Sequence, residues 1–368
     1  MSLLRSVQIL DRMLGDDGQT ELEQLKQSNK MLEERIRNLL QPSPQVNYEV
    51  LCHPAAQELA DDIVASDITR FCMHKTTWET FPDTTDNIQI DDMNSARKNT
   101  LARRHVLFVA SFHNSTSTLS QLHLLTYLCE LRPASLTVLL PFFPTGTLER
   151  IAFGEEGIVP TANTLAMMLN GMPSLGQPLR IMTYDIHALQ EQFYFHNHAG
   201  ITLHSAIHQL IRYLEKEKKN INCIVFPDDG AKKRFGKMFG KPFNIVTCIK
   251  QHTGKGDEKE VKVEDGTSES KHVLIVDDMT RSGNTMFECI GAVSNAASIS
   301  MYVTHAAFTE AFWDNFRKKA MSTIDKFYIT NSVSCTPSNT PIPKKISEEG
   351  LNAKFEIISL APQVINDL

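Results

Sequence analysis

Runs of consecutive apolar residues alternate with helical patterns from residue 46 to the end of the chain. The runs are rich in Val, Ile and Leu and are typical of strands buried on both faces of a parallel sheet. Such strands, separated by helices, indicate an α/β protein. We expect strands within residues 48–52, 105–112, 135–143, 179–187, 221–230, 243–250, 271–278, 298–308, 325–330 and 354–367.

The segments between these strands predict helices, at residues 53–65, 119–131, 161–172, 201–217 and 285–297. The strands are too many for one small sheet, and 368 residues exceed a single typical core. We therefore predict two tandem, doubly wound parallel-sheet domains at 46–200 and 201–352. Residues 353–368 form a segment that could return to the first domain.

A heptad-like seam lies ahead of the strands. Apolar residues and one Asn recur at alternating spacings of three and four within residues 22–39, and the sequence QPSPQ at 41–45 would end the helix. The seam consists of Leu22, Leu25, Asn29, Leu32, Ile36 and Leu39. Residues 1–45 are thus predicted to form a helical, coiled-coil-like extension that makes the protein a homo-oligomer. An amphipathic helix lying on the rest of the chain fits the pattern equally well.

Composition narrows the class of protein. The chain is 42% hydrophobic and 22% charged, as in soluble globular proteins, and its net charge of −6 does not favour nucleic acid as a partner. The seven cysteines lie far apart without a C-x-x-C pair, which indicates free thiols in a reducing compartment. No secretory signal is evident, and no apolar run approaches the roughly 20 residues of a membrane helix. We therefore expect a cytoplasmic protein without a membrane partner.

Three of the predicted strands end in residues that can bind a cation or a sugar. Asp185 and His187 close one strand, Asp228 closes another, and Asp277 and Asp278 close a third. A single Asp after a strand is often only a helix cap. Ligands of open parallel sheets bind beyond the carboxyl ends of the strands, so three such ends together suggest Mg²⁺ or sugar hydroxyls.

The loop after Asp278 predicts a phosphate site. Ser282, Gly283, Asn284 and Thr285 supply two hydroxyl groups and a glycine that lets the backbone approach a ligand, and a helical pattern follows directly. Backbone N–H groups at a helix N-terminus bind phosphate. The two carboxylates can accept hydrogen bonds from sugar hydroxyl groups, and the loop beside them can bind a phosphate. Together they predict a site for a sugar phosphate.

The stretch VLIVDDMTRSGNT at 273–285 resembles the ribose 5-phosphate motif shared by type I phosphoribosyltransferases and ribose-phosphate pyrophosphokinases. Other segments resemble the pyrophosphokinases in particular, namely MTYDIHALQEQFYF at 182–195, VFPDDGAKKRF at 225–235 and IVTCIK at 245–250. LTVLLPFFPTGTLER at 136–150 and WETFPDTTDNIQI at 78–90 look most like the class II branch, which does not require phosphate. The resemblance covers residues 47–368 and implies two phosphoribosyltransferase-like domains.

The resemblance also implies a reaction and a set of site residues. The anomeric hydroxyl of ribose 5-phosphate would attack the β-phosphorus of ATP, with Mg²⁺, forming phosphoribosyl diphosphate and AMP. The ribose 5-phosphate site would comprise Asp277, Asp278, Arg281, Ser282, Gly283, Asn284 and Thr285. His187, Asp228 and Asp185 would be metal ligands. Asp83 and Arg234 would contact ATP, and Lys250 and His252 would be the catalytic loop residues.

One departure from the family pattern puts the activity in doubt. The catalytic loop has His252 where the family has Arg, which removes a permanent charge and a bidentate donor. The protein could therefore be a catalytically silent, regulatory homologue. A phosphoribosyltransferase that consumes phosphoribosyl diphosphate is the second alternative, although it needs only one such domain and a base-binding hood that the sequence does not show. Arg281, where the family often has Asp, adds a positive charge near the phosphate.

Overall fold

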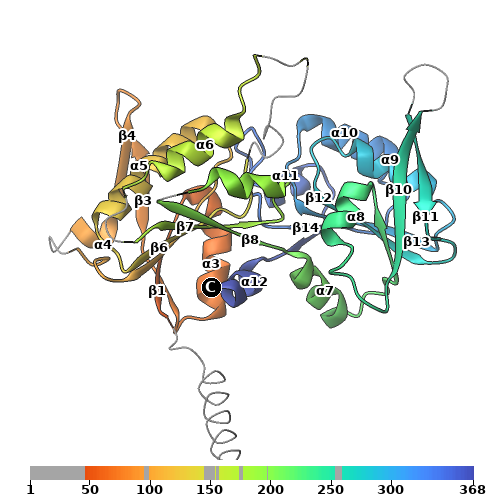
Figure 1. Ribbon diagram of the computed structural model, residues 1–368, viewed down its shortest axis with the longest axis horizontal. Helices are drawn as coiled ribbons and strands as arrows, with labels where there is room; N and C mark the ends of the chain where they lie inside the picture. The colour runs from red at the N-terminus through yellow and green to blue at the C-terminus, as the bar shows by residue number, and fades with distance from the viewer. Residues whose placement is uncertain are drawn as a thin grey trace, which may run out of the picture. The chain divides into compact units, whose positions relative to one another are not determined.

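The computed structural model describes residues 46–94, 99–144, 154, 157–173, 177–196, 198–252 and 259–368. By the density of its internal contacts the chain divides into two units, residues 1–46 and 47–368. Both sheets belong to the second unit (Figure 1). The predicted N-terminal extension at 1–45 lies outside the described residues.

The first sheet has six strands in the order β2-β1-β5-β6-β7-β8, and all neighbours are parallel. Its strands are β1 (Tyr48–Cys52), β2 (Phe71–Met73), β5 (His105–Val109), β6 (Ser135–Leu139), β7 (Leu179–Tyr184) and β8 (Ala199–His204). The helices between them are α3 (Gln57–Ser66), α5 (Ser115–Glu130) and α6 (Thr161–Asn170), with the short 3-10 helices η1 (Pro54–Ala56) and η2 (Leu189–Tyr194). The order of the strands reverses between β1 and β5.

An antiparallel hairpin adjoins this sheet, with strands β3 (Thr76–Thr80) and β4 (Asp86–Ile90) followed by α4 (Asp91–Asn94). The apolar pattern did not predict this hairpin. Its strands, TTWET and DNIQI, contain few large apolar residues, and among their residues only Ile90 is buried.

The second sheet has seven strands in the order β11-β10-β9-β12-β13-β14-β15. Only the pairing of β10 with β11 is antiparallel. Its strands are β9 (Cys223–Phe226), β10 (Asn244–His252), β11 (Lys259–Asp265), β12 (His272–Met279), β13 (Ser298–His305), β14 (Phe327–Thr330) and β15 (Phe355–Ile358). Its helices are α7 (Ile207–Lys216), α8 (Asp229–Phe235), α9 (Asn284–Ala292), α10 (Glu310–Lys319), α11 (Ile342–Glu348) and α12 (Ala361–Asp367).

Helices cover both faces of the second sheet because its central strands are apolar on both faces. Val273 and Ile275 of β12 pack with α9 and α10, whereas Leu274 and Val276 pack with α7 and α8. These four residues are fully buried. The continuous apolar runs thus fill two cores, as expected for parallel strands, and the predicted α/β class with two parallel sheets is confirmed.

Two predicted elements differ most from the structure. The helix predicted at 201–217 is wrong in its first residues, because Ala199–His204 form β8 and α7 begins only at Ile207. Ile201 and Leu203 alternate with polar residues and pack on the first core, a period-two pattern that the longer helical pattern obscured. The strand predicted at 354–367 is only four residues long, after which Pro362 lies in the first turn of α12.

The last segment of the chain contacts both sheets. Strand β15 completes the edge of the second sheet, and α12 packs against α3, which flanks the first sheet. Arg70 donates from Nη1 to the carbonyl of Ile365 at 3.0 Å. The domain boundaries at residues 200 and 352 stay predictions. No helix in the described part of the chain is long and apolar enough to cross a membrane.

Candidate active site

A pocket of about 450 Å³ opens where the strand order of the second sheet reverses, between β9 and β12. Parallel sheets bind their ligands at this kind of position. The pocket brings together nine of the residues singled out from the sequence. They are His187, Asp228, Arg234, Asp277, Asp278, Arg281, Ser282, Asn284 and Thr285. Segments as far apart as 187 and 285 thus form one site.

The two aspartates at the end of β12 have different environments. Asp277 accepts from the backbone N–H of Asp278 at 2.9 Å, and Asp278 accepts from that of Met279 at 2.8 Å. Burial, followed by the charge of Asp278, raises the pKa of Asp277. Burial also acts to raise the pKa of Asp278, but the hydrogen bond from His187 and the charge of Arg234 outweigh it and hold this pKa below its ordinary value. Asp278 is therefore the ionised member of the pair.

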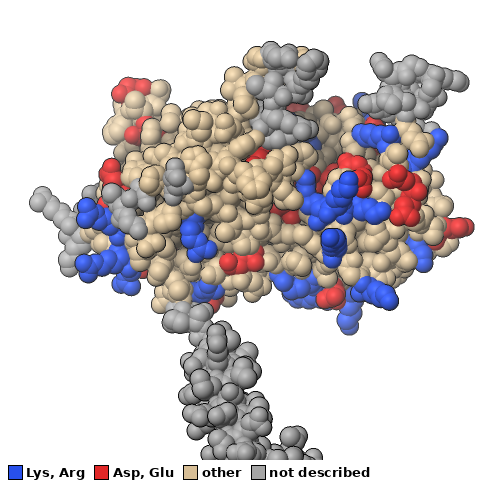
Figure 2. Space-filling model, in the orientation of Figure 1, with Lys and Arg blue, Asp and Glu red and all other residues tan. Residues whose placement is uncertain are grey.

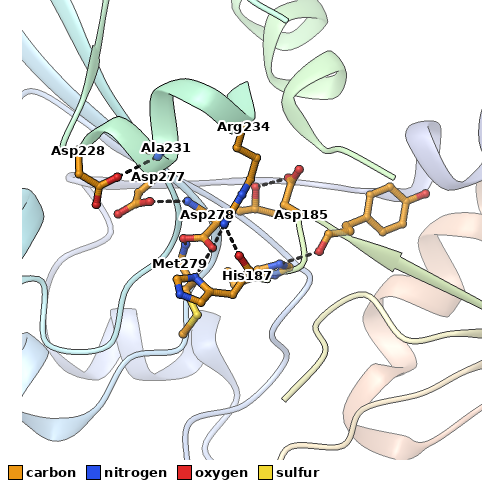
Figure 3. Close-up of polar contacts among 11 residues, drawn as sticks. Asp185, His187, Asp228, Ala231, Arg234, Asp277, Asp278 and Met279 are labelled. Carbon is orange, nitrogen blue, oxygen red and sulfur yellow. Dashed lines mark hydrogen bonds and ion pairs between the residues drawn. The ribbon is translucent and has the colours of Figure 1, made fainter. Parts of the chain in front are cut away.

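Arg234 and His187 converge on Asp278 (Figure 3). Nδ1 of His187 lies 2.7 Å from Oδ2 of Asp278, and Nη1 of Arg234 donates to the same oxygen. Arg234 also donates from Nη2 to the backbone carbonyl of His187. His187 follows β7 of the first sheet, whereas Arg234 and Asp278 belong to the second. This network therefore joins the two sheets, a role for Arg234 that its sequence position did not indicate.

Asp228 and its neighbours form the rim on the β9 side. Asp228 caps α8, with Oδ1 accepting from the N–H of Ala231 at 2.8 Å. The basic residues of α8 next to Arg234 are paired with carboxylates, since Nζ of Lys232 lies 3.1 Å from Asp265 and Nζ of Lys233 lies 2.5 Å from Asp229. Basic and acidic side chains accordingly lie side by side near α8 (Figure 2). Only Arg234 of these three cations lines the pocket.

The loop from Arg281 to Thr285 leads into α9, whose first residue is Asn284. Gly283 has a φ of +77°, and a Cβ atom built there would lie 2.1 Å from Cε2 of Phe287. Only glycine fits this position without strain. The N–H of Gly283 donates to the hydroxyl of Thr280 at 3.1 Å. The tight turn thus places the first residues of α9 in the lining of the pocket, where a phosphate site is predicted.

Lys250 approaches this loop from β10. Its Nζ donates to the hydroxyl of Thr285 at 3.1 Å and lies 3.6 Å from a carboxylate oxygen of Glu288. A cation is therefore placed beside the predicted phosphate loop. His252 is the last residue of β10, where its backbone pairs with Lys259, and its side chain lies outside the description.

Asp185 is held by protein donors and does not belong to the described lining of this pocket. Its side chain is 5% exposed, and Oδ2 accepts from the N–H of Ala206 at 3.0 Å and from the hydroxyl of Thr304 at 2.6 Å. Burial raises the pKa of Asp185. Its backbone has a φ of +38°, a strained conformation for a residue with a side chain. Asp185 thus connects the end of β7 to β13, and nothing in the sequence pointed to Thr304 as its partner.

Asp83 lies at the tip of the β3–β4 hairpin rather than in the described lining of the pocket. It accepts from the N–H and the hydroxyl of Thr85 at 3.0 and 2.6 Å. These bonds define a local turn. The proposed contact of Asp83 with ATP therefore stays a prediction.

The donors around the pocket suit Mg²⁺ held together with a substrate. In the described residues, no three His, Cys, Asp or Glu ligand atoms of the pocket lie within 4.8 Å of one another. Mg²⁺ generally uses one or two carboxylates together with water and substrate phosphates, rather than a cage made only of protein. Asp228 and His187 border the pocket on two sides, so they fit a metal ion of this kind.

Two tandem sheets, with an aspartate pair and the loop from Arg281 to Thr285 at the switch point of the second, define a phosphoribosyltransferase-like α/β protein. No family model matches the chain. The chain is 36% identical to ribose-phosphate pyrophosphokinase 4 of Oryza sativa subsp. japonica, over 89% of its own length and 97% of that protein. It is 35% identical to ribose-phosphate pyrophosphokinase 4 of Arabidopsis thaliana, over 85% and 89%.

A solved structure has the same fold. The phosphoribosylpyrophosphate synthetase of Mycobacterium smegmatis superimposes with a TM-score of 0.65 and 18% identity, over 87% of this chain and 97% of that one. With the plant relatives, this places the chain in the ribose-phosphate pyrophosphokinase family, and the predicted family is confirmed.

Proposed function

We propose that the protein transfers the diphosphoryl group of ATP to the C1 hydroxyl of ribose 5-phosphate, forming 5-phosphoribosyl 1-diphosphate and AMP. The observation that supports this most directly is the pocket itself. Its lining combines the aspartate pair and the loop from Arg281 to Thr285 with His187, Asp228 and Arg234. Groups suited to a sugar phosphate and groups suited to a nucleotide and its metal ion are thus together in one pocket.

Ribose 5-phosphate would be bound by two features of β12 and its loop. Asp277 and Asp278 would accept hydrogen bonds from the ribose hydroxyls. The N–H groups of Ser282 through Thr285, at the positive end of α9, would bind the 5-phosphate. Arg281 lines the pocket and would add positive charge beside the same phosphate.

The transfer would form a bond between the C1 oxygen and the β-phosphorus of ATP. It would break the bond from that phosphorus to the oxygen bridging to the α-phosphorus, and this oxygen leaves on AMP. The hydroxyl proton is released to solvent. Such a transfer depends on positioning and neutralisation of charge. Lys250 would stabilise the charge in transit, and Mg²⁺, held by His187 and Asp228, would neutralise the phosphate oxygens when bound.

Purified protein with ATP, Mg²⁺ and ribose 5-phosphate tests the proposal. We expect AMP and phosphoribosyl diphosphate in equal amounts. If ribose 5-phosphate binds in calorimetry but no AMP forms, with or without added phosphate, the protein is a silent homologue. Release of diphosphate from phosphoribosyl diphosphate in the presence of a nucleobase would instead indicate a phosphoribosyltransferase.

Lys250→Ala tests the assignment of the transferring cation. We expect kcat to fall by about a hundredfold or more with little change in either KM, because the charge that Lys250 offsets develops mainly in the transition state. Lys344→Ala is the control, since Lys344 is 68% exposed on α11 and pairs only loosely with Glu348 at 3.8 Å. Equal kcat for the two variants would remove Lys250 from the mechanism.

A further inference from the structure

Helix α10 contacts the phosphate loop although its residues lie about 30 positions further along the chain. Thr309, directly before α10, donates to the carbonyl of Arg281 twice, from its N–H at 3.0 Å and from its hydroxyl at 3.1 Å. Asn315 donates from Nδ2 to the carbonyl of Ser282 at 2.9 Å. Two consecutive carbonyl groups of the loop are thus bound from one neighbouring helix.

Lys319 extends this contact to the start of α9. Its Nζ donates to Oδ1 of Asn284 at 3.0 Å. Lys319 is four residues after Asn315, so the two side chains project from the same face of α10. An ammonium group therefore lies next to the first helical residue of the predicted phosphate site.

Thr309 and Asn315 make their contacts with the loop although neither side chain stabilises α10 itself. Thr309 occupies the N-cap position, yet its side chain makes no capping bond to α10. A cap of this kind is worth about 1 kcal/mol of helix stability. Asn315 lies inside the helix, where Asn has a low intrinsic propensity. Both polar groups contact the loop instead, which a role in packing alone does not explain.

The apolar face of α10 packs against Phe287 of α9, close to the same loop. Phe312 and Phe316 lie 5.6 and 6.0 Å from Phe287, measured between ring centroids. Phe287 is the residue that a side chain at position 283 would strike. Packing and hydrogen bonding from α10 thus hold the loop in one conformation.

We propose that α10 is part of the ribose 5-phosphate site. Asn315 is a positioning residue that keeps the carbonyl of Ser282 turned away from the ligand, so that the N–H groups of the loop face the phosphate. Lys319 contributes a positive charge to the same phosphate. This inference rests on the proposed function, because it assigns the residues to the binding of that substrate.

Asn315→Leu removes the donor while keeping a side chain of similar size. We expect affinity for ribose 5-phosphate to fall about five- to tenfold, the effect of one lost hydrogen bond with a partner left unpaired. The KM for ATP should change less than twofold. Asp314→Asn is the matched control, because Asp314 is the preceding residue of α10 and its side chain is 74% exposed. Asn315→Gln should restore part of the affinity.

Amide exchange in the absence of ligand gives a readout that does not depend on activity. In Asn315→Leu, the amides of residues 281–286 should exchange about five- to tenfold faster, while those of β12 keep their rates. Unchanged exchange in this segment would overturn the positioning role. If the wild-type protein neither binds ribose 5-phosphate nor forms AMP, the proposed function fails, and the exchange data still decide whether Asn315 holds the loop.

Lys319→Met tests the charge separately. We expect the KM for ribose 5-phosphate to rise about three- to fivefold at low salt and the difference to disappear near 0.5 M salt, because exposed charges are screened there. The effect of Asn315→Leu should persist at high salt. Lys319→Arg should behave like the wild type. A KM that is independent of the charge at position 319 at low salt would exclude Lys319 from the site.

Discussion

Gly283→Ala is expected to damage both the stability of the protein and its affinity for ribose 5-phosphate. Gly283 has a φ of +77°, and an added Cβ would lie 2.1 and 2.4 Å from two carbon atoms of Phe287. The ring of Phe287 cannot swing away freely, because it is 3% exposed and packs on Phe312 and Phe316. Either the loop or the core of α9 and α10 must therefore shift.

The expected loss of stability is the sum of a backbone cost and a steric cost. An L-residue in the left-handed region costs about 1–2 kcal/mol. Forcing an extra carbon against a buried ring costs about 1–3 kcal/mol. Together they predict a loss of about 2–5 kcal/mol in the free energy of unfolding. A shift of the loop would also turn its N–H groups away from the phosphate, so affinity should fall at least tenfold.

Urea unfolding and calorimetry with ribose 5-phosphate measure the two effects, and Gly291→Ala is the control. Gly291 lies in the same helix, α9, and a Cβ there would meet nothing within 4 Å. This substitution should be neutral or stabilise the protein by about 0.5–1 kcal/mol. Adding Phe287→Leu to Gly283→Ala should recover the steric part of the loss but not the backbone part.

The reasoning would be refuted if Gly283→Ala unfolded at the same urea concentration as Gly291→Ala and bound ribose 5-phosphate with unchanged affinity. A stability loss without a loss of affinity would show that the ring moves and the loop does not. In that case the conformation of the loop would not depend on the ring contacts of Phe287 with α10.

Three further predictions concern other parts of the chain. His53 is half-buried, and its desolvation, followed by the charge of His113, lowers its pKa from 6.5 to about 4 while its Nδ1 accepts from the N–H of Ala55. Between these pH values only the unfolded state binds the proton, so this contribution to stability is complete above pH 6.5 and falls by up to about 3 kcal/mol towards pH 4. His53→Asn keeps a capping acceptor and should show a smaller drop in urea titrations at pH 7, 6, 5 and 4; an equal drop contradicts the assignment. Arg234→Lys leaves a side chain that can reach only one of the two acceptors, Asp278 and the carbonyl of His187. It should lower kcat/KM about tenfold or more, measured by initial rates, and the free energy of unfolding by about 1–2 kcal/mol, measured by urea unfolding. Wild-type values would rule out the contact of Arg234 with both acceptors. Removing residues 1–45 should lower the number of chains per particle in solution if the heptad seam assembles the protein, and an unchanged number by light scattering would remove that role.

The pattern of apolar residues could predict the two sheets because their strands are buried on both faces. Runs such as 273–276 need no partner to be recognised as buried strands, since each residue faces one of the two cores. The hairpin at 76–90 was missed, and part of the edge strand Ala199–His204 was assigned to a helix, for the opposite reason. Their residues are largely half-buried or exposed, so their pattern is weak and pairing with a neighbour decides their structure.

The site could be predicted as far as its chemistry lies on single segments. Asp277, Asp278 and the loop to Thr285 are contiguous, and the carboxyl ends of strands meet at one edge of the sheet, so the pocket follows from the sequence pattern. The contacts of Asp185 with Thr304, and of Asn315 with Ser282, join residues far apart in the chain. No local pattern encodes such a pair, because each residue alone looks like an ordinary polar position.

The network on Asp278 explains why the site requires both sheets. Asp278 is 4% exposed, and a buried carboxylate is stable as an ion only with donors close by. One donor, Arg234, comes from the second sheet, whereas His187 is carried there by the end of β7 in the first. The same carboxylate would bind ribose, and the same imidazole would face the metal ion. The proposed ribose site would therefore be linked to the proposed metal site through Asp278 and His187, and this link uses residues from both sheets.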